Sequence, residues 1–231
     1  MLIDEKINGL LTDWGIEQIH FPKFLEALTH KSFIHENPDF QGASYQRLEF
    51  LGDSVLGLFV TTELYLRHPS LPEGELSKLK SFIVREETLA QMARAIGLDQ
   101  LMKVGRGEKN DLVDNDSIMA DGLEALLGAV YVSQGVERAR AVWESWIKKL
   151  EGDLFSLENL VEFDAKSKLQ EFCLKTWKSL PIYEAQEFKN KFRVTLIIQD
   201  KALLSREDVS KKKAALVLAQ SCLKYQLHLT V

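Results

Sequence analysis

Apolar residues recur at helical spacing through the first 150 residues of the chain. This pattern predicts amphipathic helices that are separated by polar segments or by segments containing proline and glycine. We expect helices over 4–13, 22–30, 45–67, 75–96, 114–133 and 135–150, with loops over 34–44 and 103–113. Since no strand-like alternation interrupts them, the front of the chain is predicted to be an all-α bundle.

The pattern changes after residue 162. Residues 164–179 retain helical spacing, whereas 182–188, 191–198 and 201–205 alternate or run apolar and β-branched, as strands do. A last helix is predicted over 209–225. We therefore expect an all-α domain at 1–151, a linker at 152–162, and a small α+β domain with the order α-β-β-β-α at 163–228.

The stretch RLEFLGDSVLGLFV, residues 47–60, places two acids in an apolar helix. Glu49 and Asp53 are four residues apart, so they lie one above the other on a helix. Apolar residues occupy every side of this stretch, which predicts a buried helix. Two buried carboxylates repel each other and lose hydration, so they need a cation or raised pKa values.

A second apolar helix carries two more acids. Between residues 118 and 132 the only charged side chains are Asp121 and Glu124, which share one face. If the two helices pack together, four carboxylates converge, and oxygen ligands without Cys or His favour Mg²⁺ or Mn²⁺. The alternative is a set of structural carboxylates that pair with nearby cations. The candidate cations are Arg47, Lys78, Lys80 and Arg85.

Charge is distributed unevenly along the chain. The formal net charge is −5, but residues 161–231 hold 13 basic and 8 acidic residues. A basic module of this kind suits a polyanion. Lys211 and Lys212 follow Ser210 at the start of the last helix, where free N–H groups already favour phosphate. Ser167 and Gln170 are small enough to reach ribose hydroxyls in the shallow groove of duplex RNA.

Targeting and cysteine patterns point to a cytoplasmic protein. The acidic, polar N-terminus is unlike a signal peptide. No run of about 18 apolar residues predicts a membrane span. Cys173 and Cys222 lack metal-site spacing, so we expect two free thiols.

Several motifs resemble the ribonuclease III family. RLEFLGDSVL at 47–56 resembles its signature, MADGLEALLGAVY at 119–131 its second acidic motif, and ALTHKS at 27–32 a further block. The tail resembles a double-stranded RNA-binding domain through DAKSKLQE at 164–171, Pro181 with Tyr183, and SKKxA at 210–214. The resemblance covers roughly residues 20 to 225 in the domain order of the family.

The resemblance implies a metal-dependent endoribonuclease that acts on double-stranded RNA. Glu49, Asp53, Asp121 and Glu124 match the metal-binding carboxylates of the family, with Asp53 and Glu124 as catalytic residues. It also implies Mg²⁺, with Mn²⁺ as a substitute, and products with 5′-phosphates and short 3′ overhangs. Precursor ribosomal RNA and mRNA are the substrates expected.

Two further residues acquire roles from the same resemblance. Glu73 matches an acidic position near the RNA or the metal, and Phe50 matches an aromatic residue that inserts into the second subunit of a homodimer. The signature helix is apolar on all sides, which is consistent with such a dimer.

The chain departs from the family pattern at four positions. Gln46 stands where a glutamate is usual, Phe188 where a histidine is usual, and Arg206 and Asp208 where glycines are usual. We expect activity to survive the change at Gln46. A non-catalytic RNA-binding relative and a helical protein-binding scaffold are the alternative functions. The presence of all four acids favours the enzyme over the first, and the basic tail argues against the second.

Overall fold

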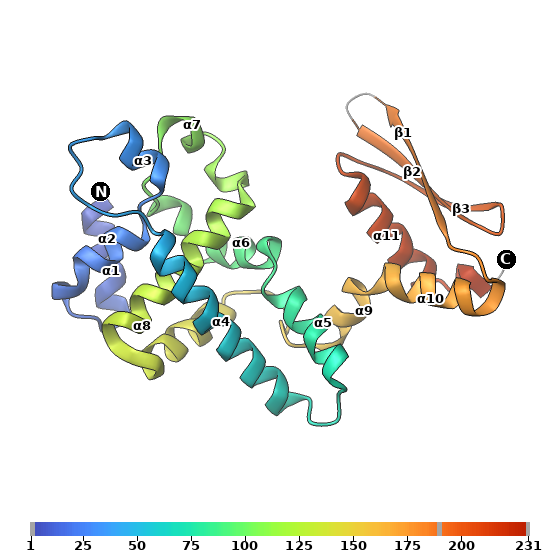
Figure 1. The fold of residues 1–231 in the computed structure, drawn as a ribbon, viewed down its shortest axis with the longest axis horizontal. Helices are drawn as coiled ribbons and strands as arrows, with labels where there is room; N and C mark the ends of the chain where they lie inside the picture. Colours follow the sequence, from blue (N-terminus) through green and yellow to red (C-terminus); the bar gives the residue numbers. More distant parts are fainter. Residues whose placement is uncertain (1–2, 189–190, 230–231) are drawn as a thin grey trace. The chain divides into compact units, whose positions relative to one another are not determined.

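The computed structural model describes residues 3–188 and 191–229 of the chain. It divides into two compact units, Met1–Phe155 and Ser156–Val231, which we call the helical unit and the α/β unit. Figure 1 shows the helices of the first unit and the sheet of the second. The predicted fold class, an all-α domain followed by a small α+β domain, is confirmed.

The helical unit is built around the pair formed by α4 (Gln46–Arg67) and α8 (Asp116–Ile147). Asn115 caps α8, because its side chain accepts a hydrogen bond from the backbone N–H of Ile118. Short 3₁₀ turns lie at Gln18–His20, Leu98–Gln100 and Leu112–Asp114. The remaining helices are α1 (Ile3–Asp13), α2 (Phe21–Ala27), α3 (Lys31–Glu36), α5 (Glu73–Ile83), α6 (Glu86–Ala95) and α7 (Arg106–Lys109).

Two glycines bring the backbones of α4 and α8 into contact. A Cβ atom at Gly52 would overlap the carbonyl oxygen of Glu124 and lie 2.5 Å from its carbonyl carbon. A Cβ at Gly128 would overlap the carbonyl oxygen of Leu48. Only glycine permits so close an approach of the two helices.

The helix predicted over 75–96 is two helices, because the chain is extended at Arg85 (ψ 153°). The hydroxyl of Thr88 donates to the carbonyl oxygen of Phe82 at 2.9 Å and accepts from Nε of Arg85 at 3.1 Å. This side chain therefore satisfies a carbonyl that the end of α5 leaves without a helical partner. The segment predicted as a loop over 34–44 also differs, since α3 extends to Glu36.

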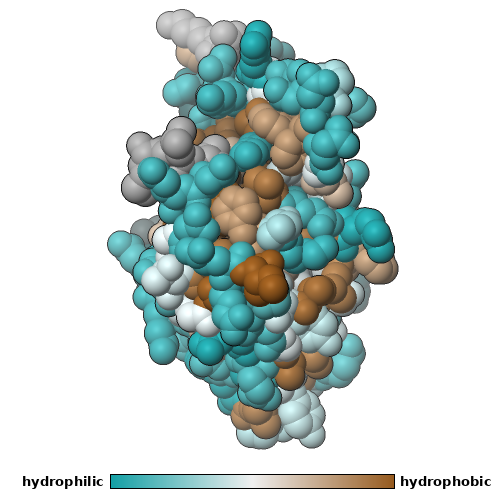
Figure 2. Space-filling model, turned by 90° about the vertical axis from the view of Figure 1, so that its left-hand side faces the viewer, coloured by the Kyte–Doolittle hydropathy of each residue, from teal (hydrophilic) through white to brown (hydrophobic). Residues whose placement is uncertain are grey.

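The helix of the signature stretch is buried on one side only, so the prediction of a helix buried all round is wrong. Val55, Phe59 and Val60 lie in the core, but Phe50 is 79% exposed and Leu58 is 55% exposed. The helices of this unit cover one face of α4 and leave the other face open. Figure 2 shows one face of the protein, where apolar side chains form separate patches among hydrophilic ones.

The α/β unit contains an antiparallel sheet in the order β1-β2-β3. Register pairs Tyr183 with Leu196, and Leu196 with Leu204. Alternate residues of β2 are buried with apolar residues of α10 and α11, which places both helices on one face of the sheet. The elements are α9 (Leu157–Phe163), α10 (Ala165–Trp177), β1 (Ile182–Phe188), β2 (Lys191–Ile198), β3 (Lys201–Asp208), α11 (Lys211–Lys224) and a 3₁₀ turn at Leu227–Leu229.

The α/β unit refines two expectations. The third strand extends to Asp208 instead of ending at 205. The segment predicted as a linker, 152–162, contains the start of α9, which Ser156 caps by accepting from the N–H of Glu158. Cys173 and Cys222 are free and buried. No helix in the described part of the chain is both long enough and apolar enough to span a membrane.

Candidate functional site

The four acids singled out in the sequence lie at the contact between α4 and α8. Glu49 and Asp53 belong to α4, and Asp121 and Glu124 belong to α8. Gly52, the neighbour of Asp53, is the residue whose backbone contacts Glu124. The close approach of the two helices therefore brings both acidic pairs to one place.

Burial and repulsion between neighbouring acids raise the pKa values of Glu49 and Glu124. The pKa of Glu124 rises to about 8, chiefly through burial and then through the nearby charges of Asp53, Asp121 and Glu49. Burial also raises the pKa of Glu49, and Asp121 adds to that shift. Carboxylates that raise one another's pKa values in this way lie close together.

The structural ion pairs that the sequence left as an alternative are not formed. Among the described residues, none of the four acids makes an ion pair, and Lys78 and Arg85 pair instead with Glu75 at 3.9 Å and Glu87 at 3.8 Å. Lys31 lowers the pKa of Glu49, but by less than Asp121 raises it. Negative charge therefore dominates this part of the α4–α8 contact.

The donor set fits a hard divalent cation. All four side chains offer carboxylate oxygens, which are the ligands that Mg²⁺ and Mn²⁺ prefer. In the described part of the chain, no group of three or more Asp, Glu, His or Cys side chains is arranged as a metal site, so the fit rests on the chemistry of the donors. A divalent cation would offset the repulsion that raises the pKa values of Glu49 and Glu124.

Two further residues lie near the acids, Tyr45, which no motif assigned a role, and His30, which belongs to the ALTHKS block at 27–32. Tyr45 is 2% exposed, and its hydroxyl donates to Oδ2 of Asp121 at 3.2 Å. His30 is also buried, and its ring lies 5.5 Å from that of Tyr45. Burial lowers the pKa of His30. A polar aromatic residue directly before an acid-bearing helix is the only signal in the sequence that points to Tyr45.

The proposed RNA contacts of the α/β unit lie at the starts of its helices. Ser167 is exposed and Gln170 is half-buried, both in the first half of α10. Lys211 is exposed at the first position of α11, and its ammonium group lies 4.5 Å from the ring centre of Phe192. Ser210 caps this helix by accepting from the N–H of Lys213. The side chain of Lys212 lies outside the described residues.

Comparisons with known proteins agree with the motifs. The Ribonuclease-III-like family model matches residues 23–150, and the double-stranded RNA binding motif matches residues 165–226. Ribonuclease 3 of Symbiobacterium thermophilum is 36% identical over 211 residues, which is 88% of this chain and 87% of that protein. Ribonuclease 3 of Dechloromonas aromatica is also 36% identical, over 96% of each chain.

The chain belongs to the ribonuclease III family. This is a family of double-strand-specific endoribonucleases. A solved structure of the nuclease domain of ribonuclease III from Campylobacter jejuni, described as showing flexibility in a region involved in dimer formation, is 33% identical. It covers 61% of this chain and 94% of its own, with a TM-score of 0.54.

Two residues near the ribonuclease III signature face solvent. Gln46 is the first residue of α4, and its Oε1 accepts from the hydroxyl of Ser44 at 3.3 Å. Glu73 is the first residue of α5, and its Oε1 accepts from the hydroxyl of Ser77 at 2.7 Å. Among the contacts of the described residues, neither side chain touches any of the four acids.

The other departures from the ribonuclease III pattern lie in the α/β unit. Arg206 and Asp208 pair at 3.7 Å on β3, and Asp208 also accepts from the N–H of Ser210. Phe188 is 48% exposed at the end of β1, with the guanidinium of Arg193 at 5.5 Å from its ring centre. Where the family has glycines and a histidine, this chain therefore has larger side chains that contact near neighbours in the sheet or in its turns.

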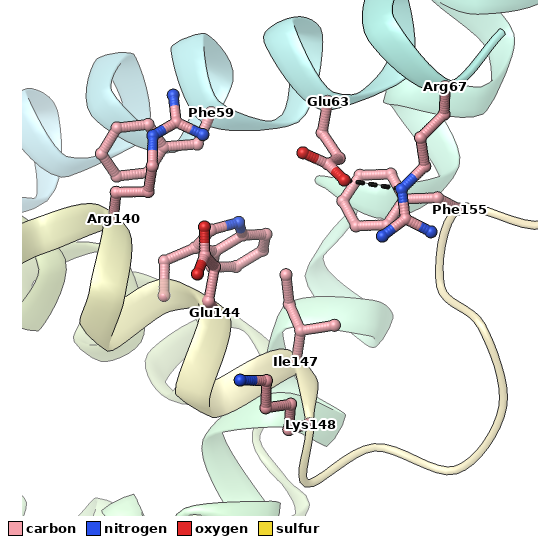
Figure 3. Close-up of a pocket in the computed structure, with 9 residues that line it drawn as sticks. Phe59, Glu63, Arg67, Arg140, Glu144, Ile147, Lys148 and Phe155 are labelled. Atoms are coloured by element: carbon pink, nitrogen blue, oxygen red, sulfur yellow. Dashed lines mark hydrogen bonds and ion pairs between the residues drawn. The ribbon is translucent and has the colours of Figure 1, made fainter. Parts of the chain in front are cut away.

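A hollow of the helical unit lies apart from the acids. It is bounded by the second half of α4 and the end of α8, and its lining includes none of the four carboxylates. Figure 3 shows Arg140 over Phe59 and Arg67 over Phe155, at 4.7 and 4.9 Å from the ring centres. Arg67 also pairs with Glu63 at 2.6 Å. The contact of Arg140 with Phe59 joins α8 to α4, and that of Arg67 with Phe155 joins the end of α4 to the segment after α8. Nothing about these contacts indicates a ligand.

Proposed function

We propose that the chain hydrolyses phosphodiester bonds in double-stranded RNA with a divalent cation held by Glu49, Asp53, Asp121 and Glu124. The cation is Mg²⁺, with Mn²⁺ as a substitute. The observation that carries the proposal is the placement of two acidic pairs at the close contact of α4 and α8, where burial and then the charges of Asp53, Asp121 and Glu49 raise the pKa of Glu124 to about 8. The products expected from the family resemblance are 5′-phosphates with short 3′ overhangs.

The four acids have different roles in the proposed reaction. When bound, the divalent ion activates the attacking water and neutralises charge on the departing 3′ oxygen. Asp53 is exposed and Glu124 is half-buried, and the backbone of Glu124 lies at the contact with Gly52 of α4. We assign all four acids to holding the cation and, from the family resemblance, assign the catalytic roles to Asp53 and Glu124.

One assay separates the enzyme from a non-catalytic RNA-binding relative. Long duplex RNA is incubated with the full chain in Mg²⁺ and, separately, in Ca²⁺. Ca²⁺ accepts looser coordination than Mg²⁺, so it supports binding at carboxylates without the tight geometry of Mg²⁺. Cleavage in Mg²⁺ alone is the expected result, and duplex binding without cleavage in either metal would favour the binding protein.

RNA binding is assigned to the helix starts of the α/β unit, through Ser167, Gln170, Lys211 and Lys212. Glu73 is assigned a place near the RNA in the helical unit. The lysines would neutralise phosphates, and the short polar side chains of α10 would contact ribose hydroxyls in the minor groove. Ser210 supports this arrangement, since it caps α11 and orders the turn that carries the lysines.

Replacement of Lys211 and Lys212 by alanine is expected to weaken binding to duplex RNA of any sequence. Phosphate contacts carry no sequence information, and each lost contact lowers the salt slope of the binding constant by about 1. The measurement is duplex binding in Ca²⁺ over a range of salt concentrations. Lys224→Ala, at the opposite end of the same helix, is the matched control. An unchanged salt slope in the double variant would exclude a phosphate clamp here.

We further propose that the chain is a homodimer whose interface includes Phe50. The open face of α4 supports this, because Phe50, Leu58 and Tyr65 are 79%, 55% and 70% exposed on one helix. Exposed apolar patches of this kind mark interaction surfaces. Two copies would present two sets of carboxylates, one for each strand of a duplex.

Phe50→Ala is expected to raise the dimer dissociation constant by about 30- to 100-fold, the scale of a buried aromatic anchor. The free subunit should keep its stability, since this side chain is 79% exposed there. Sedimentation equilibrium measures the change. Ile19→Ala removes an equally exposed side chain (78%) from a 3₁₀ turn and serves as control. A Phe50→Ala dimer intact at nanomolar protein would argue against this interface.

The cellular role proposed from the family resemblance is the processing of ribosomal RNA precursors and mRNA in the cytoplasm. Long paired stems in such transcripts offer the A-form shape that a double-stranded RNA-binding domain recognises.

A further inference from the structure

Tyr45 makes a specific contact with one of the four acids. Its hydroxyl donates to Oδ2 of Asp121 at 3.2 Å, and the residue is 2% exposed. Within the described residues, this is the only hydrogen bond to a carboxylate of the four acids. The carboxylate of Asp121 is therefore oriented by a donor, whereas those of Glu49, Asp53 and Glu124 are not.

The phenol of Tyr45 is held from several sides. Its backbone N–H donates to the carbonyl oxygen of Thr29 at 2.9 Å. Its own carbonyl accepts from the N–H groups of Leu48 and Glu49, at 2.8 and 2.9 Å, in the first turn of α4. Its ring packs against that of His30. Tyr45 thus joins the segment before α3, the start of α4 and the carboxylate on α8.

His30 is itself fixed. Its Nδ1 accepts from the hydroxyl of Ser32 at 2.7 Å and from the N–H of Ser32 at 3.3 Å. The same hydroxyl accepts from the N–H of Gly105 at 2.8 Å. The imidazole that packs against Tyr45 is therefore itself hydrogen-bonded, through Ser32, to the backbone at Gly105.

We infer that Tyr45 is a positioning residue, which orients the carboxylate of Asp121 so that it can bind the divalent cation. The hydrogen bond occupies one acceptor direction of Oδ2 and leaves Oδ1 for the ion. Outer-shell donors of this kind fix the geometry of a metal ligand. The inference rests on the proposed function, because it assumes that Asp121 is a ligand.

The test is Tyr45→Phe in the full chain, which removes the hydroxyl and keeps the ring against His30. The affinity for Mn²⁺, measured by calorimetry without RNA, is expected to fall about 10-fold, at the lower end of the effect of lost outer-shell partners. The Mg²⁺ concentration for half-maximal cleavage should rise by the same factor. The cleavage rate at saturating Mg²⁺ and duplex binding in Ca²⁺ should stay near wild type. Tyr225→Phe, which removes an exposed hydroxyl from the α/β unit, is the control.

A second pair of variants tests whether Tyr45 acts through Asp121. In an Asp121→Asn background, removal of the hydroxyl should have no further effect on Mn²⁺ affinity. An equal further loss would overturn the link, as would unchanged Mn²⁺ affinity in Tyr45→Phe alone. The variant Glu124→Gln distinguishes a failure of the metal assignment from a failure of the role of Tyr45. If it still cleaves RNA at the wild-type rate, the metal assignment fails; if it is inactive while Tyr45→Phe binds Mn²⁺ normally, only the role of Tyr45 fails.

Discussion

Glu124→Gln is expected to reduce cleavage of long duplex RNA by roughly 10³-fold or more and to leave duplex binding nearly intact. A loss of that size corresponds to about 4 kcal/mol of transition-state stabilisation. The amide keeps the shape of the side chain but removes the charge that attracts a divalent cation. Burial, and then the charges of Asp53, Asp121 and Glu49, raise the pKa of Glu124 to about 8, so all three other acids lie near this carboxyl group.

Single-turnover cleavage in Mg²⁺ and duplex binding in Ca²⁺ measure the two properties separately. Glu144→Gln is the matched control, since Glu144 belongs to the same helix, is exposed, and lines the hollow of Figure 3 instead of the acidic cluster. Cleavage by Glu124→Gln at the wild-type rate would remove this residue from the catalytic site.

Gly52→Ala is expected to destabilise the helical unit by about 3 kcal/mol or more and to impair cleavage as well. The added methyl group would meet the backbone of Glu124, with 2.5 Å to its carbonyl carbon, and a backbone cannot move aside as a flexible side chain can. The two helices would have to separate. The carboxylates of Asp53 and Glu124 would then move apart with them.

Gly57→Ala, five residues further along α4, is the control for this substitution. A Cβ there meets only the end of the Lys80 side chain, at 3.7 Å. Alanine should therefore stabilise the helix by about 0.5–1 kcal/mol through its higher helix propensity. Urea denaturation of both variants measures the difference. A Gly52→Ala protein as stable as Gly57→Ala would contradict the backbone contact.

The acidic pairs were visible in the sequence because helical spacing alone places side chains four or three residues apart on one face. Glu49 with Asp53, and Asp121 with Glu124, need no tertiary information to be recognised as pairs. Their convergence required the further assumption that the two helices pack, and the structure supplies the reason in Gly52 and Gly128. Glycine at a helix contact has many uses, so the sequence did not identify this one.

Other features depend on contacts that no local pattern encodes. The end of α5 lacks glycine and proline, and the break follows from the hydroxyl of Thr88 reaching the carbonyl of Phe82. Tyr45 and Asp121 are 76 residues apart, so their hydrogen bond is a product of the tertiary fold. The apolar pattern of α4 did not by itself indicate its open face, and only the family resemblance placed Phe50 against a second subunit. An apolar side chain such as Phe50 looks the same in sequence whether its own subunit or another molecule covers it.

The part of α8 beyond the interruption at Gly135 packs against the N-terminal end of the helical unit, which has a consequence for folding. The backbone there (φ 78°, ψ −178°) is one that only glycine adopts readily, and it redirects the helix. Beyond it, Trp146 is buried with its ring 5.7 Å from that of Trp14. Trp14, which directly follows the first helix, therefore packs against a residue about 130 positions later in the chain. The helical unit can complete this contact only after residue 146 has been synthesised, so its closure depends on a contact between residues far apart in the chain.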